Sequence, residues 1–567
     1  MAESDEDKRI TYFAATHTRG KRDMFGIRGI DRGKHIYVIG KTGMGKSTML
    51  ENMAIQDIQN GEGLAFIDPH GSTAEKLLDF VPYERIKDVV YFAPFDTEHP
   101  VGFNVMEDVG YDKRHLVVSG LMGALKRIWV DAWSARMEYI LQNTLLALLE
   151  YPGSTLLDVN RMLTNKTFRN HVVEKITDPI VKAFWTEEFA AFTDTYTREA
   201  TPAIQNKIGQ FTANPLIRNI VGQSFSSFDL RKMMDEKKIF IVNLSKGRMG
   251  ETNASLLGSM LTVKIYLAAM SRAEESASRL AKLPRFYFYV DEFQSMMNEA
   301  FADILSESRK YKLALTLANQ YIEQMEEKVR DAVFGNVGTL VVFRVGPFDA
   351  DVLKVVFEPT FVAEDLVELG LGQIYLTLMV DGVGTPPFSA ETIPPIEAPH
   401  ISYREDCVVN SRTLFGRPRS EIEKGISEKQ TEFAMPPRKE KEKDKSRFQP
   451  QNAPRRDQPS YAPKPSFPQP KRDEPDRSPL RAAIDAARVG PSSAPVRAPI
   501  DILREKQARR EAQPEVRSEP QAQPQPQSRP QPQQVPQPPK EAIAEKADDV
   551  SPELLRAVLG SDSDYSS

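Results

Sequence analysis

The sequence predicts an α/β fold that is interrupted by an all-α insertion and followed by a long disordered tail. Three observations support this prediction. Short apolar runs alternate with helical patterns over much of the first 410 residues, residues 111–234 show helical spacing alone, and 25 of the 41 prolines lie after residue 410. At about 100 to 200 residues per domain, a chain of 567 residues has room for two to four domains.

Eight short runs rich in β-branched and aromatic residues are predicted to be strands. Several of them are apolar almost throughout, as expected of strands that are covered on both faces of a parallel sheet. In chain order they span residues 35–39, 64–67, 89–92, 239–243, 286–290, 313–317, 339–343 and 374–378.

The strand pattern divides the chain into five predicted parts. These are an N-terminal polar arm (1–27), the first part of an α/β motor (28–110), an all-α insertion (111–234), the second part of the motor (235–410) and the tail (411–567). The insertion lacks strand-like runs, and its apolar residues recur at helical spacing. Its three tryptophans, Trp129, Trp133 and Trp185, are expected to serve in packing.

The tail is predicted to be disordered because its Pro/Gln-rich composition cannot bury enough apolar surface to offset chain entropy. It contains a charge run at 438–447 and is richest in Pro and Gln at 521–539. Two segments, 478–489 and 551–559, read Ser-Pro followed by a helical pattern. Each is either a helix that binds a partner or a transient helix without one.

Composition favours a cytoplasmic protein without a transmembrane segment. The longest apolar candidate, 256–270, is short for a membrane span and is broken by Lys264, and the acidic N-terminus does not resemble a secretory signal. Cys407 is the only cysteine, which excludes an intramolecular disulfide. The formal net charge of -5 provides no global basic field, so binding to nucleic acid would need a local basic patch or an assembled channel.

A phosphate-binding loop follows the first predicted strand. Gly40-Lys41-Thr42-Gly43-Met44-Gly45-Lys46-Ser47 satisfies GxxxxGK[ST] and runs directly into a helical stretch that begins at Thr48. The glycines allow backbone N–H groups to turn toward phosphates, and the helix N-terminus adds its positive end. Lys46 is expected to reach the β- and γ-phosphates of ATP, and the Ser47 hydroxyl to ligate Mg²⁺.

A second acidic element completes the pattern of a nucleotide hydrolase. The apolar run 286–290 ends in Asp291 and Glu292. Asp291 is predicted to hold the Mg²⁺ shell, and Glu292 to polarise the attacking water. Because a protein that merely binds nucleotide has less need of this second acid, the pair favours hydrolysis over simple binding.

Three further residues are candidates around the nucleotide. Gln320 follows the predicted strand 313–317, and strand ends at the carboxyl edge of such sheets line the nucleotide cleft. Its amide is therefore predicted to sense the γ-phosphate, the alternative being a loop amide that caps a turn. Arg309 and Arg344 are candidates for an arginine finger, although a surface arginine is by default a solvated charge.

The P-loop, Ile67-Asp68-Pro69-His70-Gly71, Val290-Asp291-Glu292-Phe293-Gln294 and Leu317-Ala318-Asn319-Gln320 together resemble the FtsK/HerA superfamily. More narrowly, residues 28–394 resemble the type IV secretion coupling proteins of the TraG/TraD kind, which are conjugative DNA-transfer ATPases. The resemblance implies a RecA-like motor, a homo-hexameric ring with DNA in its pore, and an arginine finger shortly before the sensor glutamine, which corresponds by position to Arg309. It also implies that Asp68 lies near the nucleotide, the alternative being a turn-forming Asp-Pro.

The resemblance leaves three functions to be distinguished. Membrane-bound coupling proteins begin with transmembrane helices, whereas this chain begins with the polar arm. The first function is therefore that of a coupling protein that docks from the cytoplasm on a secretion channel and receives relaxase-bound DNA. The second function is that of a soluble HerA-like repair translocase. The third is a nucleotide-binding scaffold that recruits partners through its tail. DNA-contacting residues are not evident, although Lys246 and Arg248 are basic residues of a loop for which a solvated role is the default.

Overall fold

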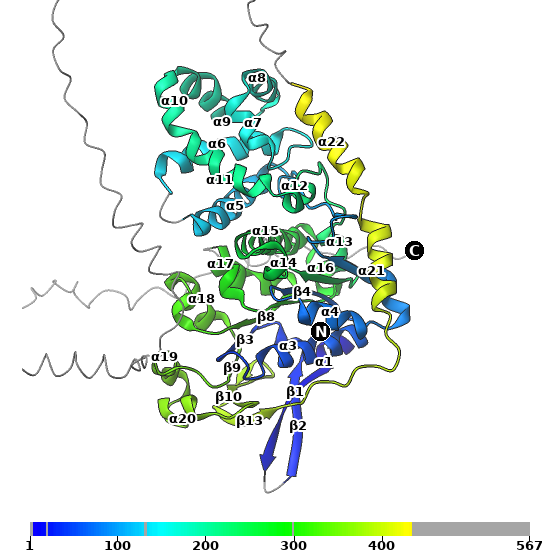
Figure 1. Cartoon of the computed structure of the whole chain (residues 1–567). Coiled ribbons are helices and arrows are strands. Elements are labelled where there is room, and N and C mark those ends of the chain that lie inside the picture. Colours follow the sequence, from blue (N-terminus) through cyan, green and yellow to red (C-terminus); the bar gives the residue numbers. More distant parts are fainter. Residues whose placement is uncertain (1–3, 19–20, 130–132, 298–299, 434–567) are drawn as a thin grey trace, which may run out of the picture. The chain divides into compact units, whose positions relative to one another are not determined.

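The computed structural model describes residues 4–18, 21–129, 133–297 and 300–433 (Figure 1). The two predicted helical segments at 478–489 and 551–559 lie outside the described residues.

One mixed sheet of eleven strands organises the described part of the chain. Its parallel part is, in spatial order, β9 (Thr339–Val342), β3 (Ile36–Ile39), β8 (Leu313–Asn319), β7 (Phe286–Val290), β4 (Gly63–Asp68), β6 (Ile239–Asn243) and β5 (Val89–Phe92). The antiparallel edge continues from β9 through β10 (Gln373–Thr377), β13 (Phe388–Thr392), β1 (Ile10–Thr18) and β2 (Lys21–Arg28). The predicted α/β fold class is confirmed, and each of the eight predicted strands is present.

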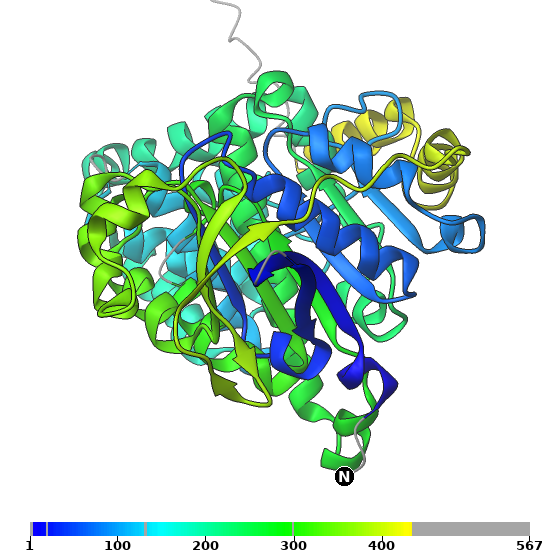
Figure 2. The same cartoon turned by 90° about the horizontal axis from the view of Figure 1, so that it is seen from below.

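The N-terminal residues differ from the predicted polar arm. After a short helix, α1 (Asp5–Lys8), β1 and β2 form a hairpin, and β1 pairs with β13 through Ala14 and Ala15. Figure 2 shows this dark-blue hairpin beside the yellow-green strand β13. The prediction of an arm at 1–27 was wrong because the first half of β2 is exposed and largely polar, and because the second strand that pairs with β1, β13, lies more than 300 residues away in the sequence.

Helices cover both faces of the sheet, and alternate residues of one strand point to opposite faces. In β3, Ile36 and Val38 belong to the core that includes residues of α3 (Lys46–Gln59) and α4 (Ser72–Asp79), whereas Tyr37 and Ile39 belong to the core on the other face. That second core includes α15 (Glu251–Met270), α17 (Ala300–Glu307) and α18 (Glu327–Asn336). The remaining short helices of the sheet region are α2 (Gly29–Arg32), α14 (Lys246–Met249), α16 (Ala277–Lys282), α19 (Pro347–Phe357) and α20 (Ala363–Glu368), and β11 (Met379–Val380) pairs with β12 (Val383–Gly384).

The described residues between β5 and β6 begin with a loop at 93–110 and then form helices joined by short connections. These helices are α5 (Arg114–Ile128), α6 (Ala135–Glu150), α7 (Asp158–Thr164), α8 (Lys166–Lys175), α9 (Pro179–Ala183), α10 (Asp194–Ala200), α11 (Pro202–Ala213), α12 (Pro215–Val221) and α13 (Leu230–Asp235). Figure 1 shows these cyan and green helices stacked beyond α15. Trp185 is buried among them, and Trp129 and Trp133 pack against the same core.

The long helix α15 lies between the sheet and this helical part (Figure 1). Within the described residues, 251–274 is the one helical stretch that is long and apolar enough to cross a membrane, and 78% of its most apolar window is buried inside the fold. Because the core helix of a globular protein meets the same criteria of length and composition, we interpret α15 as a core helix.

Two helices continue the folded part beyond the predicted start of the tail. They are α21 (Arg404–Phe415), which packs on β5 and α4, and α22 (Arg419–Thr431), which contacts α12. Ser411 is buried, and its hydroxyl accepts a hydrogen bond from the backbone N–H of Tyr91 at 2.9 Å. The predicted tail boundary at 411 was therefore wrong, because the few apolar residues of these helices, such as Ile422 and Ile426, are buried on elements distant in sequence.

This packing predicts different effects for two truncations. A chain that ends at residue 433 should unfold at the same temperature as the full chain, since it keeps both helices. A chain that ends at residue 403 exposes the surfaces on which Cys407, Ile422 and Ile426 are buried. Burial of each isoleucine contributes about 1.5 to 3 kcal/mol to the free energy of unfolding. Thermal unfolding followed by circular dichroism should show a lower midpoint for the shorter chain, and equal midpoints for both would contradict the assigned packing.

Candidate nucleotide-binding site

The P-loop leaves the carboxyl end of β3 and leads into α3. Its backbone is anchored on neighbouring strands: the N–H of Gly40 donates to Asn319 at 3.4 Å, and that of Lys41 donates to the Arg344 carbonyl at 2.8 Å. Gly43 and Gly45 have φ angles of +77° and +114°, which glycine adopts at little cost. A Cβ at Gly43 would meet no atom within 4 Å, and Gly43 is exposed, so this part of the loop is open to a ligand from solvent.

Lys46, the first residue of α3, is folded against this loop. Its buried ammonium donates to the carbonyls of Gly40 at 2.6 Å and Lys41 at 3.1 Å. Burial lowers the pKa of Lys46, while the nearby carboxyls of Asp291 and Glu292 raise it. The hydrogen bonds of this ammonium go to neutral carbonyls. It can exchange them for stronger, charge-assisted hydrogen bonds to phosphate oxygens.

Asp291 joins the end of β7 to the first turn of α3. Its Oδ2 accepts a hydrogen bond from the Ser47 hydroxyl at 2.7 Å, and its Oδ1 accepts one from the N–H of Glu292 at 2.9 Å. Burial raises the pKa of Asp291, and the negative charges of Glu292 and Asp68 raise it further, against the hydrogen bond from Ser47. A buried carboxylate beside a hydroxyl, with two further acids acting on it, provides oxygen atoms suited to a hard divalent cation.

Gln320 connects the P-loop to Glu292. Because β8 lies between β3 and β7, its carboxyl end places Gln320 between the two elements. The Gln320 amide nitrogen donates to Glu292 Oε1, and its Oε1 accepts from the Thr42 hydroxyl at 2.9 Å. The structure thus brings Lys46, Ser47, Asp291, Glu292 and Gln320 to one edge of the sheet.

Glu292 is held in an unusual conformation. Its φ of +50° lies in the left-handed region, which is costly for a residue other than glycine and persists when surrounding contacts enforce it. The Gln294 amide also donates to Glu292, to Oε2 at 2.6 Å. We did not single out Gln294 from the sequence; its position two residues after Glu292 was the available signal.

Asp68 has a local structural role. Its two carboxylate oxygens accept hydrogen bonds from the N–H groups of His70 at 2.8 Å and Ala74 at 2.9 Å, at the start of α4. This is the geometry of a turn and a helix N-terminus. Its charge nevertheless acts on the neighbouring Asp291.

The two candidate arginine fingers lie at opposite edges of the sheet. Arg344 follows β9 at the carboxyl edge, where its carbonyl contacts the P-loop. Arg309 is exposed in the turn before β8, next to Ser308, which contacts His35 before β3. With seven residues in β8 at about 3.3 Å each, Arg309 lies roughly 20 Å from the nucleotide site of its own chain.

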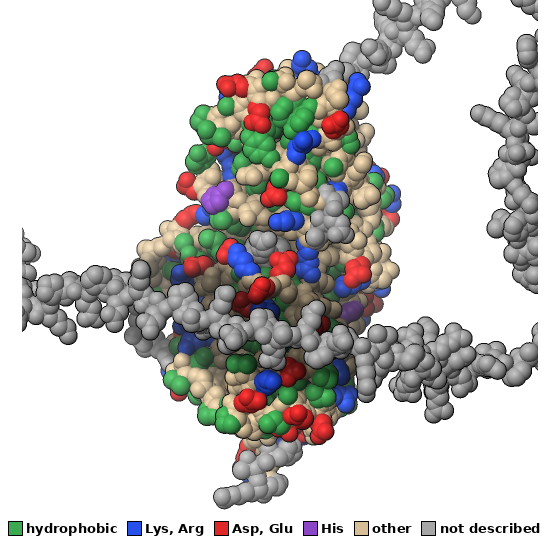
Figure 3. All heavy atoms as spheres, turned by 90° about the vertical axis from the view of Figure 1, so that its left-hand side faces the viewer, with side chains coloured by type: hydrophobic (Ala, Val, Ile, Leu, Met, Phe, Trp, Pro, Cys, Tyr) green, Lys and Arg blue, Asp and Glu red, His purple; other side chains and the backbone are tan. Residues whose placement is uncertain are grey.

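Lys246 and Arg248 are both paired with acids. Lys246 lies 3.7 Å from Glu251 and Arg248 lies 3.6 Å from Glu75. On the face shown in Figure 3, Lys and Arg side chains likewise alternate with Asp and Glu. The described surface on this side therefore offers mixed rather than uniformly basic charge.

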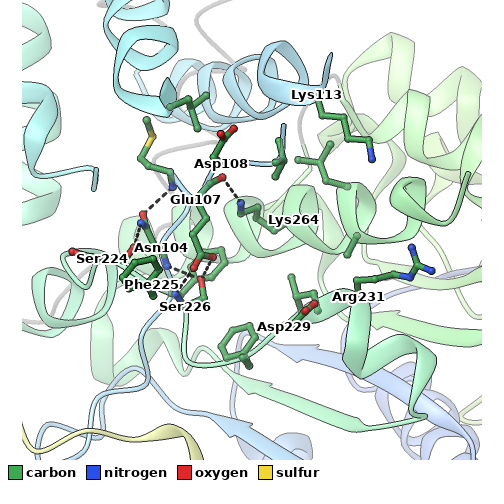
Figure 4. A pocket seen from close by; sticks show the side chains of 18 of the residues that line it. Asn104, Glu107, Asp108, Lys113, Ser224, Phe225, Ser226, Asp229, Arg231 and Lys264 are labelled. Carbon is green, nitrogen blue, oxygen red and sulfur yellow. Dashed lines mark hydrogen bonds between the residues drawn. The ribbon is translucent and has the colours of Figure 1, made fainter. Parts of the chain in front are cut away.

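A cavity of about 900 Å³ lies away from the P-loop, between the helical part and α15 (Figure 4). Its charged groups are largely satisfied: Glu107 accepts from Ser226, and Arg231 donates to Asp235, Ser271 and Glu275. Lys264 donates to the Glu107 carbonyl at 3.3 Å, and burial lowers its pKa to about 8. None of the predicted nucleotide-binding residues lines this cavity.

Comparison with known proteins supplies a family and a fold. A family model described as the type IV secretion-system coupling protein DNA-binding domain matches residues 30–351. No curated protein matches the chain.

Among solved structures, the bacterial conjugative coupling protein TrwBdeltaN70, in a trigonal form with sulphate, is 15% identical with a TM-score of 0.50, over 72% of this chain and 92% of that chain. The plasmid coupling protein TrwB in complex with ADP and Mg²⁺ is 16% identical with a TM-score of 0.48, over 72% and 92%. VirB4 of Thermoanaerobacter pseudethanolicus is 12% identical with a TM-score of 0.45, over 71% and 99%. The first likeness supports a shared fold.

Proposed function

The chain belongs to the family of type IV secretion-system coupling proteins, whose DNA-binding domain model matches more than half of it, and we propose that it is an ATP-hydrolysing DNA translocase that serves a secretion or conjugative DNA-transfer system. The observation that carries the proposal is the junction of three strand ends: Ser47 is bonded to Asp291, and Gln320 bridges Thr42 and Glu292. Such a junction places a phosphate-binding loop, a metal-binding carboxylate and a base around one point.

Binding of ATP is assigned to the P-loop, Gly40 to Thr48. The loop N–H groups and the N-terminus of α3 face the phosphates, and the Lys46 ammonium leaves the carbonyls of Gly40 and Lys41 for the β- and γ-phosphate oxygens. This exchange is favourable because a buried ammonium, whose pKa is lowered by burial, gains an anionic partner.

Ser47 and Asp291 fit a Mg²⁺ ion, since their oxygens are 2.7 Å apart and the charges of Glu292 and Asp68 act on Asp291. When bound, this ion neutralises charge on the phosphate oxygens. Glu292 orients the attacking water and accepts its proton, while Gln320 holds Glu292 and contacts the γ-phosphate side of the loop through Thr42.

We assign Arg309 to the site of a neighbouring subunit in a homo-hexameric ring. At the edge of the sheet opposite the P-loop, it is too far from the nucleotide of its own chain to act there, yet it is exposed. A guanidinium supplied in trans would meet the negative charge that spreads over the transferring phosphoryl group.

The partner in this proposal is DNA, together with secretion-channel or relaxase proteins at the inner face of the cell membrane. The family match to a DNA-binding domain favours this function over a scaffold that only binds nucleotide. A HerA-like repair translocase shares the same motor, so gene neighbourhood distinguishes the two: channel and relaxase genes support secretion, and nuclease genes support repair.

The proposal predicts that DNA stimulates ATP hydrolysis in a salt-dependent manner. Phosphate release should rise when single- or double-stranded DNA is added at 50 mM salt, and the half-saturating DNA concentration should increase steeply at 200 mM salt because phosphate contacts release counterions. The basal rate without DNA is the control for a direct effect of salt on the site. A rate that DNA leaves unchanged at both salt concentrations would favour the nucleotide-binding scaffold.

A further inference from the structure

The segment that follows Glu292 is fastened to the helical layer through its backbone. Each of four successive carbonyls, at residues 294 to 297, accepts a hydrogen bond from a side chain of α5 or α15. Arg127 of α5 donates to the first and the last, those of Gln294 and Met297. The two serines of α15 that hold the middle pair are Ser255, on the Ser295 carbonyl, and Ser259, on the Met296 carbonyl at 2.6 Å.

Arg127 makes these bonds at a cost in solvation. Burial lowers the pKa of its guanidinium while the charge of Glu326 raises it, and among the described residues no salt bridge to Arg127 is formed. Arg127 is partly buried, and a partly buried charge that makes no salt bridge depends on its hydrogen bonds to offset its lost solvation. Among the described residues, Arg127 donates hydrogen bonds to the carbonyls of Gln294 and Met297. The position of its side chain therefore depends on this segment.

The same segment holds Glu292. The Gln294 side chain is buried and donates to Glu292 Oε2 at 2.6 Å, while its own Oε1 has no partner among the described residues. Glu292 also keeps its φ of +50°, a conformation that relaxes once its surroundings stop enforcing it. A continuous path of contacts therefore leads from Arg127 on α5, through the backbone and amide of Gln294, to the carboxylate of Glu292.

We propose that Arg127 is a positioning residue for ATP hydrolysis, which sets the place of Glu292 through Gln294 and thereby links the helical part of the chain to turnover. This inference rests on the proposed function of the same site. Because α5 begins the helical part and lies against α15, a displacement of α5 relative to α15 pulls on the Gln294 and Met297 carbonyls and moves Glu292 without touching the P-loop. A shift of the helical part then changes the rate of hydrolysis and leaves the affinity for nucleotide unchanged.

The test compares Arg127→Ala with Arg169→Ala in the full chain. Arg169 is a matched control, since its guanidinium also donates to two backbone carbonyls, of Met162 at 3.0 Å and Leu163 at 3.3 Å, and burial lowers its pKa as well. Arg127→Ala should lower kcat for ATP by about 10²-fold, the effect of a small misplacement of a reacting group. Its KM and its affinity for a fluorescent ATP analogue should match the control, and Arg127→Lys should recover part of kcat.

Two further variants separate positioning from general stability. Gln294→Ala keeps the carbonyl that Arg127 holds and removes the amide that contacts Glu292, so it should lower kcat similarly, and Arg127→Ala with Gln294→Ala should cost little more than either alone. Arg127→Ala should not lower the residual rate of Glu292→Gln.

Three outcomes would overturn the inference: a kcat for Arg127→Ala equal to that of Arg169→Ala, equal losses of kcat and ATP affinity, or additive effects with Gln294→Ala. Should Arg127→Ala fail to fold, normal kcat in Gln294→Ala overturns it. An unaltered chain without any ATPase activity would instead refute the proposed function, a result distinguishable from all of these.

Discussion

Glu292→Gln is expected to bind ATP with nearly unchanged affinity and to release phosphate about 10² to 10⁴ times more slowly than the unaltered chain. The substitution keeps the size of the side chain, and its oxygen can still accept the bond from Gln320 or Gln294. It removes the negative charge that takes the proton of the attacking water. The loss should therefore appear in kcat, with little change in KM.

The matched control is Glu327→Gln, which makes the same change at an exposed position in the first turn of α18. It should hydrolyse ATP at the unaltered rate. Phosphate release by Glu292→Gln at the rate of this control would show that another group activates the water, and the assignment of Glu292 would fail.

Arg309→Ala is expected to lower the rate of ATP turnover by about 10³- to 10⁵-fold, while leaving ATP binding intact. The reason is its proposed place in the neighbouring subunit's site, from which it contributes to phosphoryl transfer without holding the ground-state nucleotide. Activity per chain should also rise with protein concentration as rings assemble. Lys310→Ala is the control, because this neighbouring side chain is exposed and its charge is paired with Glu307.

Mixing two inactive variants tests the role in trans directly. Where Arg309→Ala and Lys46→Ala chains meet in one ring, some interfaces pair an intact P-loop with an intact Arg309, and partial ATPase activity should return. Absence of recovery despite demonstrated co-assembly would contradict the role, as would full activity of Arg309→Ala alone. Arg344, which lies at the P-loop of its own chain, would then be the next residue to test.

The parallel part of the sheet was predictable because its strands are buried on both faces and appear as continuous apolar runs, as in 286–290. The antiparallel edge was not, since β1 and β2 carry exposed polar residues and their hairpin joins this sheet only through the pairing of β1 with β13. The helices α21 and α22 were missed for a related reason. Their few buried side chains contact β5, α4 and α12, and such long-range contacts leave no periodic pattern of their own.

At the site, local motifs were sufficient to select Lys46, Ser47, Asp291, Glu292 and Gln320. The spatial order of the strands was not contained in those motifs. The insertion of β8 between β3 and β7 is what places Gln320 between Thr42 and Glu292. The contacts of Arg127 with the segment after Glu292 join residues about 170 positions apart and were equally invisible in the sequence.

Hydrolysis at this site is proposed to move the chain along DNA. The most direct test is displacement of streptavidin from the biotinylated ends of single- and double-stranded DNA, followed over time with ATP and with a non-hydrolysable analogue. Streptavidin should be displaced from at least one of the two DNAs, and this displacement should require ATP and be lost in Glu292→Gln. Vigorous ATP hydrolysis by the unaltered chain in the presence of DNA, with streptavidin retained on every end, would contradict this proposal.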